Sequence, residues 1–310
     1  MYYLGIDGGG TKTALAIMNN KEEIISEIVV STCHYMQIGF DGFKEVITDG
    51  VKRLLESNQI DENDIEYAVF GIPGYGEIKQ DAKKIEDIVA DTFPKFPVYI
   101  CNDVEIGLAE LKIGETGVNI VAGTGSMAFG MNGRGQKERA GGWGHHLLGD
   151  EGSAYWIAMN TLHEFCKQAD GRKEKTPLYT IIKQELLLED DFDILRVVVQ
   201  EKKMDRGLVA QYSQLCFKAA KENDIVAINI FKGAAIELAE QIKATFIKLG
   251  TGEEKRTVFC NGGVFKAKEY LLDSLQKNIE PFEAEFIVNE KAPVFQACIY
   301  AKKLAEVVVK

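Results

Sequence analysis

The chain has 310 residues, 46% of them hydrophobic, which is enough for about two domains with buried cores. Its formal net charge of -11 opposes nucleic-acid binding, because that binding needs basic patches that neutralise phosphates. No apolar stretch approaches the length of a membrane span, and the N-terminus lacks the features of a signal peptide. We therefore expect a cytoplasmic protein whose partners include neither nucleic acid nor membrane.

The six cysteines lie far apart in the sequence, so no CxxC spacing of a zinc or iron–sulfur site occurs. We interpret them as isolated, reduced thiols of a cytosolic protein. The alternative is a metal or redox pair formed by cysteines distant in sequence.

The first part of the chain alternates strand and helix patterns. β-Branched and apolar runs predict strands, and apolar residues at helical spacing predict helices. Strands are expected at residues 2–6, 13–18, 24–30, 67–72 and 98–101, and helices at residues 43–55, 80–91 and 104–111.

The pattern of strand, glycine turn and strand restarts near residue 113. We expect strands at residues 118–122, 127–131, 258–260 and 285–288, a helix from about residue 153, an interrupted helical region over residues 161–249, and a last helix at residues 293–308. This weak duplication predicts an α/β protein with two similar domains. We assign residues 1–112 plus 292–310 to the first domain and residues 113–291 to the second.

A glycine-rich segment follows the first predicted strand. Glycines let the backbone approach an anion closely, and successive amides can then cradle phosphate oxygens. The segment opens a strand rather than a helix and does not match a Walker A loop. A simple glycine-rich β-turn is the alternative. This first glycine loop consists of Gly8, Gly9, Gly10, Thr11, Lys12 and Thr13. Asp7, at the strand end, is a candidate to hold Mg²⁺ through water.

Two more glycine loops follow later strands. The second glycine loop, Gly123, Thr124, Gly125 and Ser126, has the same setting as the first, which makes a chance match less credible. The third glycine loop, Gly262 and Gly263, follows the strand at residues 258–260, and its small residues could admit an adenine ring or a ribose. A tight strand-to-helix turn explains the third loop equally well.

The three loops resemble those of the superfamily of actin-like ATPases and sugar kinases. The segments GGWG at residues 141–144 and GDEGSAYW at residues 149–156 are similar to the N-acetylglucosamine kinase group of the BadF/BadG/BcrA/BcrD-type ATPase family. The resemblance covers nearly the whole chain. It implies duplicated ribonuclease H-like (actin-like ATPase) domains with an interdomain cleft. It also implies ATP- and Mg²⁺-dependent phosphorylation of the 6-hydroxyl of an amino sugar, and we expect a homodimer.

Asp103 follows the strand at residues 98–101 and is the candidate general base. In the resembling family an aspartate at this point accepts the proton of the sugar 6-hydroxyl. The alternative is that Asp103 only caps a helix beginning at Val104. Asp150 has the same two interpretations, because the family implies a hydrogen bond to sugar and its position suits the N-cap of the next helix. Thr124 and His34 are further sugar-binding candidates.

The chain departs from the family pattern where the sugar would be recognised. Cys33 lies where relatives often have Asn, Met127 follows Ser126 where animal relatives have Asn, and residues 144–149 are about one residue longer than usual. His145 and His146 could contact sugar, but a lone histidine is more often structural. These differences leave N-acetylglucosamine, glucosamine, glucose and N-acetylmuramate open as acceptors.

Two other functions remain open. Some BadF-type ATPases activate a dehydratase or reductase through a bridging iron–sulfur cluster, but the glycine-flanked cysteines of such activators do not occur here. A non-catalytic sugar sensor is the third hypothesis. Asp7, Asp103 and the glycine loops argue against it, since a sensor needs no phosphoryl-transfer residues.

Overall fold

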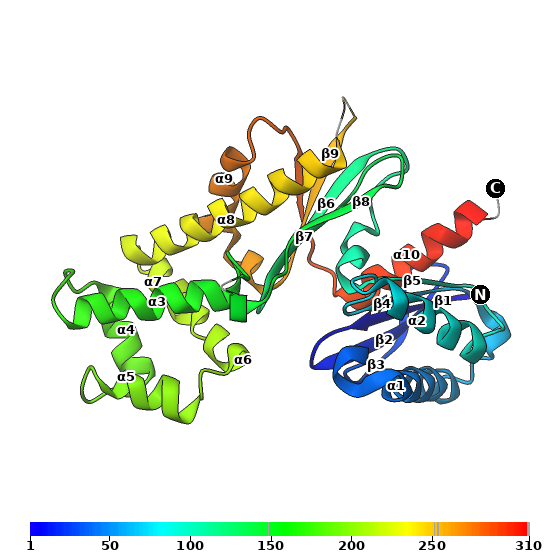
Figure 1. Cartoon of the computed structure of the whole chain (residues 1–310), viewed down its shortest axis with the longest axis horizontal. Coiled ribbons are helices and arrows are strands. Elements are labelled where there is room, and N and C mark those ends of the chain that lie inside the picture. The colour runs from blue at the N-terminus through cyan, green and yellow to red at the C-terminus, as the bar shows by residue number, and fades with distance from the viewer. Residues whose placement is uncertain (148, 251, 253, 309–310) are drawn as a thin grey trace. The chain divides into compact units, whose positions relative to one another are not determined.

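The computed structural model describes residues 1–147, 149–250, 252 and 254–308. The chain divides into two compact units (Figure 1). Unit 1 comprises Met1–Lys112 and Asn289–Lys310, and unit 2 comprises Ile113–Val288.

Unit 1 is built on a mixed five-stranded sheet with the order β3-β2-β1-β4-β5. The first three strands form an antiparallel meander, and β4 and β5 run parallel to β1. The central strand β1 is mostly buried, whereas the edge strand β3 alternates between exposed and half-buried residues. The elements are β1 Tyr2–Gly8, β2 Lys12–Asn19, β3 Ile24–Ser31, α1 Tyr35–Ser57, η1 Glu62–Asp64, β4 Ile65–Ile72, α2 Lys79–Thr92, β5 Val98–Asn102, η2 Asp103–Leu108 and α10 Pro293–Val308.

Apolar cores cover both faces of this sheet. On one face Phe43 and Leu54 of α1 pack with Leu4 of β1. On the other face the last helix, α10, lies directly against β1, and a Cβ atom on Gly5 would lie 2.7 Å from the Cys298 backbone nitrogen. The sheet is therefore fixed between helices from both ends of the chain (Figure 1).

Unit 2 repeats the same topology. Its sheet has the order β10-β9-β6-β7-β8, in which β6, β7 and β8 form the antiparallel meander and β9 and β10 run parallel to β6. The predicted duplication is confirmed. Strand β8 was not predicted from the sequence. The elements are β6 Thr116–Ala122, β7 Ser126–Met131, β8 Lys137–Gly141, η3 His145–Leu147, α3 Ala154–Ala169, α4 Pro177–Glu185, α5 Asp193–Leu195, the π-helical turn η4 Arg196–Glu201, α6 Arg206–Ala210, α7 Ser213–Lys221, α8 Ile225–Leu249, β9 Arg256–Asn261, η5 Gly263–Ala267, α9 Lys268–Asn278 and β10 Glu285–Val288.

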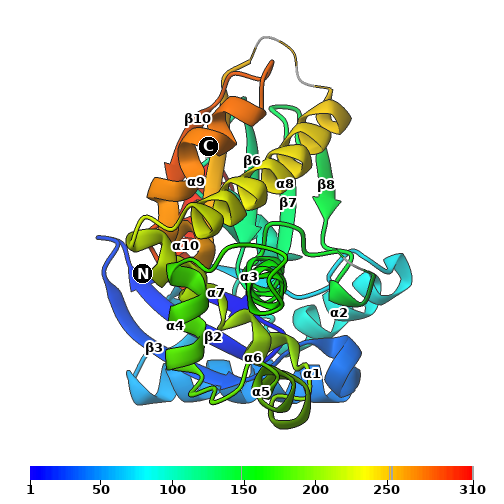
Figure 2. The same ribbon diagram turned by 90° about the vertical axis from the view of Figure 1, so that its left-hand side faces the viewer.

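A helical insertion, α3 to α8, separates β8 from β9 in unit 2. It is interrupted several times, as expected for this charged region, and its longest helix, α8, packs across the sheet (Figure 2). α8 begins at the side chain of Asp224, which accepts from the Val226 and Ala227 amides, and ends at the left-handed Gly250. The insertion thus has a firm attachment to the sheet through α8.

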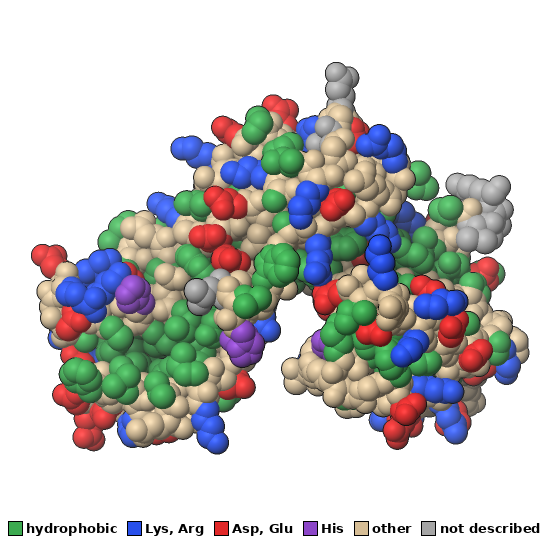
Figure 3. All heavy atoms as spheres, viewed as in Figure 1, with side chains coloured by type: hydrophobic (Ala, Val, Ile, Leu, Met, Phe, Trp, Pro, Cys, Tyr) green, Lys and Arg blue, Asp and Glu red, His purple; other side chains and the backbone are tan. Residues whose placement is uncertain are grey.

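Charged side chains of both signs are interspersed over the face shown in Figure 3, with no extended basic stripe on that face. Among the residues that the structure describes, no helix is long and apolar enough to cross a membrane.

Candidate active site

The first glycine loop forms the β1–β2 hairpin of unit 1. The Gly9 amide donates to the Lys12 carbonyl at 2.9 Å, and the Thr32 hydroxyl donates to the Gly9 carbonyl at 2.7 Å. A Cβ atom on Gly8 would lie 2.6 Å from the Cys33 sulfur and 2.6 Å from Pro73, so only glycine fits there. Gly10, Thr11 and Lys12 are exposed at the tip, where backbone amides and the Lys12 ammonium can meet an anion.

Thr13, the last residue of this loop, faces the interior instead. Its side chain is fully buried and its hydroxyl accepts from the Cys33 amide at 2.9 Å. The thiol of Cys33 is buried as well. Thr13 therefore joins the hairpin to the segment after β3, and its buried side chain does not reach the exposed tip of the loop.

His34 is half-buried beside the β4 end. Within the described part of the chain, its Nδ1 atom is buried without a hydrogen-bond partner. Burial lowers the pKa of His34, although the charge of Glu77 raises it. A neutral imidazole with an unsatisfied ring nitrogen has the capacity to bind one hydroxyl group.

The carboxylates of Asp7 and Asp103 belong to the same end of the unit 1 sheet. Asp7 lies on β1 opposite Gly71 of β4, and Asp103 directly follows β5 on the other side of β4. A Cβ atom on Gly71 would lie 3.2 Å from the Asp103 Cα and would clash with Ile106, so the close approach of η2 to β4 requires glycine.

Both carboxylates have raised pKa values. Burial is the main cause for Asp7, and the charge of Asp103 adds to it, so the pKa of Asp7 rises to about 7 despite the nearby Lys12. Burial raises the pKa of Asp103 to about 6, and Glu77 adds to the increase, while the Val104 amide opposes it. Two carboxylates that repel each other in a partly desolvated position are typical of a functional site.

Asp103 is the first residue of the 3₁₀ helix η2. The N-cap is Asn102, whose side chain accepts from the Val104 amide at 3.3 Å. The opposite side of η2 is fixed by the buried Glu105, which accepts from the Tyr99 hydroxyl at 2.6 Å and from the Tyr300 hydroxyl at 3.3 Å. Asp103 thus lies on a helical turn that has its own cap and is anchored to β5 and α10.

The second glycine loop forms the β6–β7 hairpin of unit 2, at the position that the first loop has in unit 1. The loop closes through the Gly123 amide, which donates to the Gly125 carbonyl at 2.9 Å. The first turn of α3 attaches to it, since the Ala154 amide donates to the Gly123 carbonyl at 2.8 Å and the Tyr155 amide donates to the Thr124 carbonyl at 3.4 Å. The GDEGSAYW segment therefore supports the second glycine loop.

Asp150 does not cap α3, so that part of the sequence interpretation was wrong. Ser153 is the cap, and its hydroxyl accepts from the Trp156 amide at 3.2 Å. Asp150 is buried with a positive φ of 65°, and its Oδ1 accepts from the Ser126 amide at 3.3 Å. Its Oδ2 lies 2.7 Å from Nη2 of Arg206, a residue that the sequence analysis did not select.

The third glycine loop lies next to the second at one end of the unit 2 sheet, because β9 pairs with β6. Gly262 has a φ of 104°, and a Cβ atom on it would clash with the Ala122 carbonyl and lie 2.9 Å from the Gly123 nitrogen. A Cβ atom on Gly263 would meet nothing within 4 Å. Gly262 is thus required by packing, whereas Gly263 borders open space.

His145 and His146 lie in η3, close to the second glycine loop. Their ring centroids are 3.8 Å apart, and the His145 ring meets the Tyr155 ring edge-on at 5.4 Å. Burial, His146 and Arg206 lower the pKa of His145, whereas Asp150 and Asp205 raise it. Leu148, in the longer segment at residues 144–149, lies outside the described residues.

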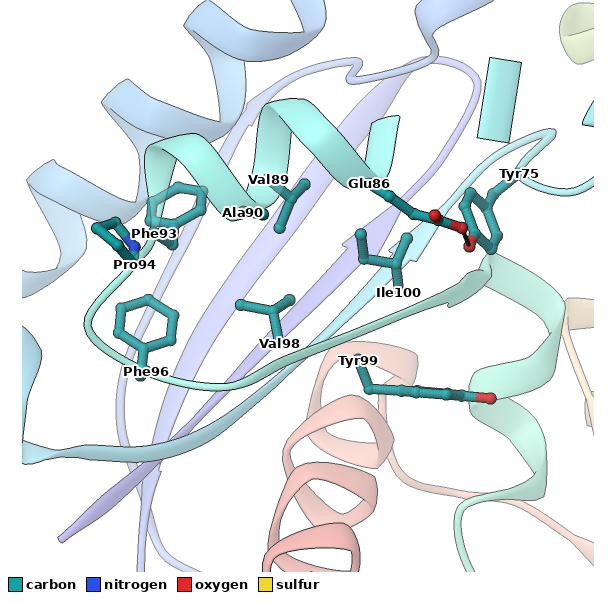
Figure 4. A pocket seen from close by; sticks show the side chains of 10 residues that line it. All are labelled: Tyr75, Glu86, Val89, Ala90, Phe93, Pro94, Phe96, Val98, Tyr99 and Ile100. Carbon is teal, nitrogen blue, oxygen red and sulfur yellow. Dashed lines mark hydrogen bonds between the residues drawn. The ribbon is translucent and has the colours of Figure 1, made fainter. Parts of the chain in front are cut away.

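A separate groove of about 560 Å³ lies on unit 1 between α2 and β5 (Figure 4). Apolar side chains line most of it, and the Tyr75 hydroxyl donates to Glu86 at 2.8 Å. None of its lining residues belongs to a glycine loop, and neither Asp7 nor Asp103 is among them. This groove is distinct from the polar residues described above.

The doubled sheet topology, with a glycine hairpin after the first strand of each sheet, defines an actin-like ATPase fold. Residues 4–294 match the model of the BadF/BadG/BcrA/BcrD ATPase family, and the chain belongs to this family. The resemblance found in the sequence motifs is thereby confirmed.

Relatives and solved structures match over nearly the whole chain. An N-acetyl-D-glucosamine kinase from Dictyostelium discoideum is 31% identical over 287 residues, 89% of each chain. An N-acetylmuramic acid/N-acetylglucosamine kinase from Clostridium acetobutylicum is 29% identical over 97% of this chain and 98% of the relative. A crystal structure of a candidate N-acetylglucosamine kinase from Chromobacterium violaceum has a TM-score of 0.71 at 19% identity, covering 96% of this chain and 98% of that one.

Proposed function

We propose that this protein transfers the γ-phosphoryl group of ATP to the 6-hydroxyl of an amino sugar, with N-acetylglucosamine as the favoured acceptor. The observation that carries the proposal is the placement of Asp7 and Asp103 at one end of a sheet whose first hairpin is a glycine loop. The kinase relatives, which match over 89–97% of this chain, support the same reaction.

Asp103 is the proposed general base. The sugar 6-hydroxyl oxygen forms a bond to the γ-phosphorus, the bond from that phosphorus to the β–γ bridging oxygen breaks, and ADP leaves. Asp103 accepts the hydroxyl proton. A pKa of about 6 keeps Asp103 ionised at neutral pH while leaving it basic enough to help, because a base is most effective when its pKa is near the working pH.

The glycine loops are the proposed phosphate and nucleoside contacts. Residues 8–13 and 123–126 present backbone amides to phosphate oxygens, and Lys12 adds a positive charge. Thr13 contributes through its backbone, since its side chain is fully buried. Gly263 leaves open space for the nucleoside, because a Cβ atom on it would meet nothing within 4 Å, and Gly262 lets the third loop approach the second closely.

Asp7 is the proposed residue for Mg²⁺, through water. The residues present suit the ion, since burial and the charge of Asp103 both disfavour an ionised Asp7 that has no cation beside it other than Lys12 among the described residues. Mg²⁺, when bound, neutralises charge on the phosphates. Asp7 would hold the ion through water, and Asp103 would remain available to the sugar.

Asp150, Thr124 and His34 are the proposed sugar contacts. Asp150 is buried beside the second glycine loop, and His34 has an unsatisfied ring nitrogen beside the β4 end. We propose residues 1–112 with 292–310, and residues 113–291, as the functional domains. We further propose that the protein works in the cytoplasm and that it is a homodimer. Light scattering of the purified protein would test the oligomeric state.

A panel of acceptors tests the proposed function. ADP release would be measured with ATP and Mg²⁺ in the presence of N-acetylglucosamine, glucosamine, N-acetylmuramic acid or glucose. We expect at least one amino sugar to stimulate ADP release strongly, with glucose a poorer acceptor. ADP release that no sugar changes would contradict the proposal. Acid-labile iron in the purified protein would instead favour the activator ATPase.

A further inference from the structure

Arg206 places a cation on the second glycine loop. It is the first residue of α6, whose N-cap Asp205 accepts from the Leu208 amide at 2.9 Å. Its Nη2 atom lies 2.7 Å from Asp150 Oδ2 and is so close to Gly125 that a Cβ atom there would clash with it. The guanidinium therefore rests against the loop backbone, and only a glycine at position 125 permits this.

The Arg206 guanidinium has unused hydrogen-bonding capacity. Its Nε atom is buried, and within the described part of the chain it has no hydrogen-bond partner. Asp150 does not use up the donor set, because its Oδ1 accepts from the Ser126 amide and its Oδ2, although 2.7 Å from Arg206 Nη2 as an ion pair, has no hydrogen-bond partner among the described residues. A buried donor without an acceptor is costly, so an incoming acceptor would be favoured. The side chain is 35% exposed, which leaves a ligand access to the group.

The neighbouring charges permit an anion at this position. Asp150 and Asp205 are acidic, but Asp150 is paired with Arg206 and the Asp205 side chain is used as a helix cap. His145 also lies near the pair, and because burial lowers its pKa the neutral ring adds no negative charge there. Arg206 keeps its own charge at every working pH, because an arginine in a protein does not lose its proton.

We propose that Arg206 binds an oxyanion of a substrate at the second glycine loop, and that Asp150 holds its guanidinium there. This inference rests on the proposed kinase function. The shared chemistry is an oxygen anion accepting from a guanidinium, as carboxylates and phosphates do. Two substrates can supply it: a phosphoryl oxygen of ATP, or the carboxylate of an acidic amino sugar such as N-acetylmuramic acid.

Arg206→Met, with Arg206→Lys beside it, tests the inference. Met keeps much of the side-chain length but removes every donor. The matched control is Arg196→Met, which removes an arginine of the same insertion whose partner is the half-exposed Glu201. For each variant, ATP affinity would be measured by calorimetry without sugar. kcat and KM would be measured with N-acetylglucosamine and with N-acetylmuramic acid, and thermal unfolding would verify folding.

The ATP and sugar measurements distinguish the two possible sources of the anion, a phosphoryl oxygen of ATP and the carboxylate of N-acetylmuramic acid. Loss of a charge-assisted hydrogen bond predicts at least a roughly tenfold effect in Arg206→Met, with partial recovery in Arg206→Lys. If the anion is phosphoryl, ATP affinity or kcat falls equally with both sugars. If it is the sugar carboxylate, kcat/KM falls for N-acetylmuramic acid alone. A wild type that does not phosphorylate N-acetylmuramic acid excludes the carboxylate source, and the ATP arm then decides.

Two results would overturn the inference. One is an Arg206→Met protein that matches Arg196→Met within twofold in every constant. The other is weakened binding of the neutral sugar with unchanged ATP affinity, because Arg206 would then act only as a support for Asp150. If the wild type phosphorylates no sugar, the proposed kinase function fails. The ATP affinities of the variants would still test the role of Arg206.

Discussion

Asp7 and Asp103 lie at the same end of the unit 1 sheet, separated by Gly71 of β4, and the charge of Asp103 raises the pKa of Asp7. The missing side chain at Gly71 allows η2, and with it Asp103, to approach the strand. The proposed catalytic role of Asp103 and the proposed metal-binding role of Asp7 are therefore coupled through charge, and each can be tested by changing one carboxylate.

Asp103→Asn should lower kcat by at least about a hundredfold, because a general base typically contributes about 10²–10⁴-fold. Sugar affinity should change far less, since the amide retains the size and one acceptor. Asn102 remains to cap η2, so the fold should persist. Steady-state kinetics and sugar titration would measure this, with the exposed Asp91→Asn as control. Near-normal kcat with reduced thermal stability would make Asp103 a structural residue only.

The wild-type rate should fall as the pH drops through about 6. The pKa of Asp103 is raised to about 6, so the carboxylate is lost by protonation below that value and the base is lost with it. Glu77→Gln removes a negative charge that raises this pKa, so the acidic limb should move to lower pH. The pH dependence of kcat/KM, measured for the wild type and for Glu77→Gln, would test this. If the acidic fall in kcat/KM occurs at the same pH in both proteins, Asp103 is not the group whose protonation causes it.

Asp7→Asn should stabilise the metal-free protein while removing Mg²⁺-dependent activity. The folded pKa of Asp7 is raised to about 7 from an ordinary value of 3.8, so the ionised group destabilises the fold at pH 8. The penalty, and hence the gain from Asn, should diminish as the pH falls from about 7 toward 4. Urea unfolding with a chelator at pH 8 and pH 5 measures it. Equal or lower stability of Asp7→Asn at pH 8 would contradict the account.

Gly263→Leu should weaken ATP binding at least about tenfold while sparing the sugar. The new side chain has room in the protein, because a Cβ atom there meets nothing within 4 Å, and it would occupy the proposed nucleoside space. Gly262→Ala is the contrasting variant and should unfold at lower temperature, since Gly262 has a φ of 104° and abuts Ala122. Unchanged ATP affinity in folded Gly263→Leu would place the nucleoside elsewhere.

Strong local patterns made most of the fold predictable. The duplication is indicated by the apolar strands β1 and β6 and by the glycine hairpin that follows each of them. Buried strands and glycine turns have distinctive compositions and can be recognised in a sequence. Strand β8 escaped prediction because its sequence, KERAG, lacks β-branched and aromatic residues and it pairs only with β7 at the sheet edge. The segment is a strand because it pairs with β7, and its own residue types do not indicate one.

The candidate site was only partly predictable for a related reason. Motifs indicated Asp7, Asp103 and Asp150, but Arg206 lies 56 positions beyond Asp150 in a five-residue helix with no motif of its own. Only the packing of the helical insertion brings the two together. The misassigned cap at Asp150 arose because Ser153, three residues later, is an equally good cap, and the positive φ of Asp150 excludes it from that role.

Identification of the product tests the central claim most directly. The purified protein would be incubated with ATP, Mg²⁺ and N-acetylglucosamine, and the product examined by ³¹P–¹H correlation NMR. The account predicts one phosphomonoester whose phosphorus couples to the two protons on carbon 6, formed at least about a hundredfold more slowly by Asp103→Asn. A phosphate on any other carbon, or ADP formation without a phosphorylated sugar from any acceptor of the panel, would contradict it.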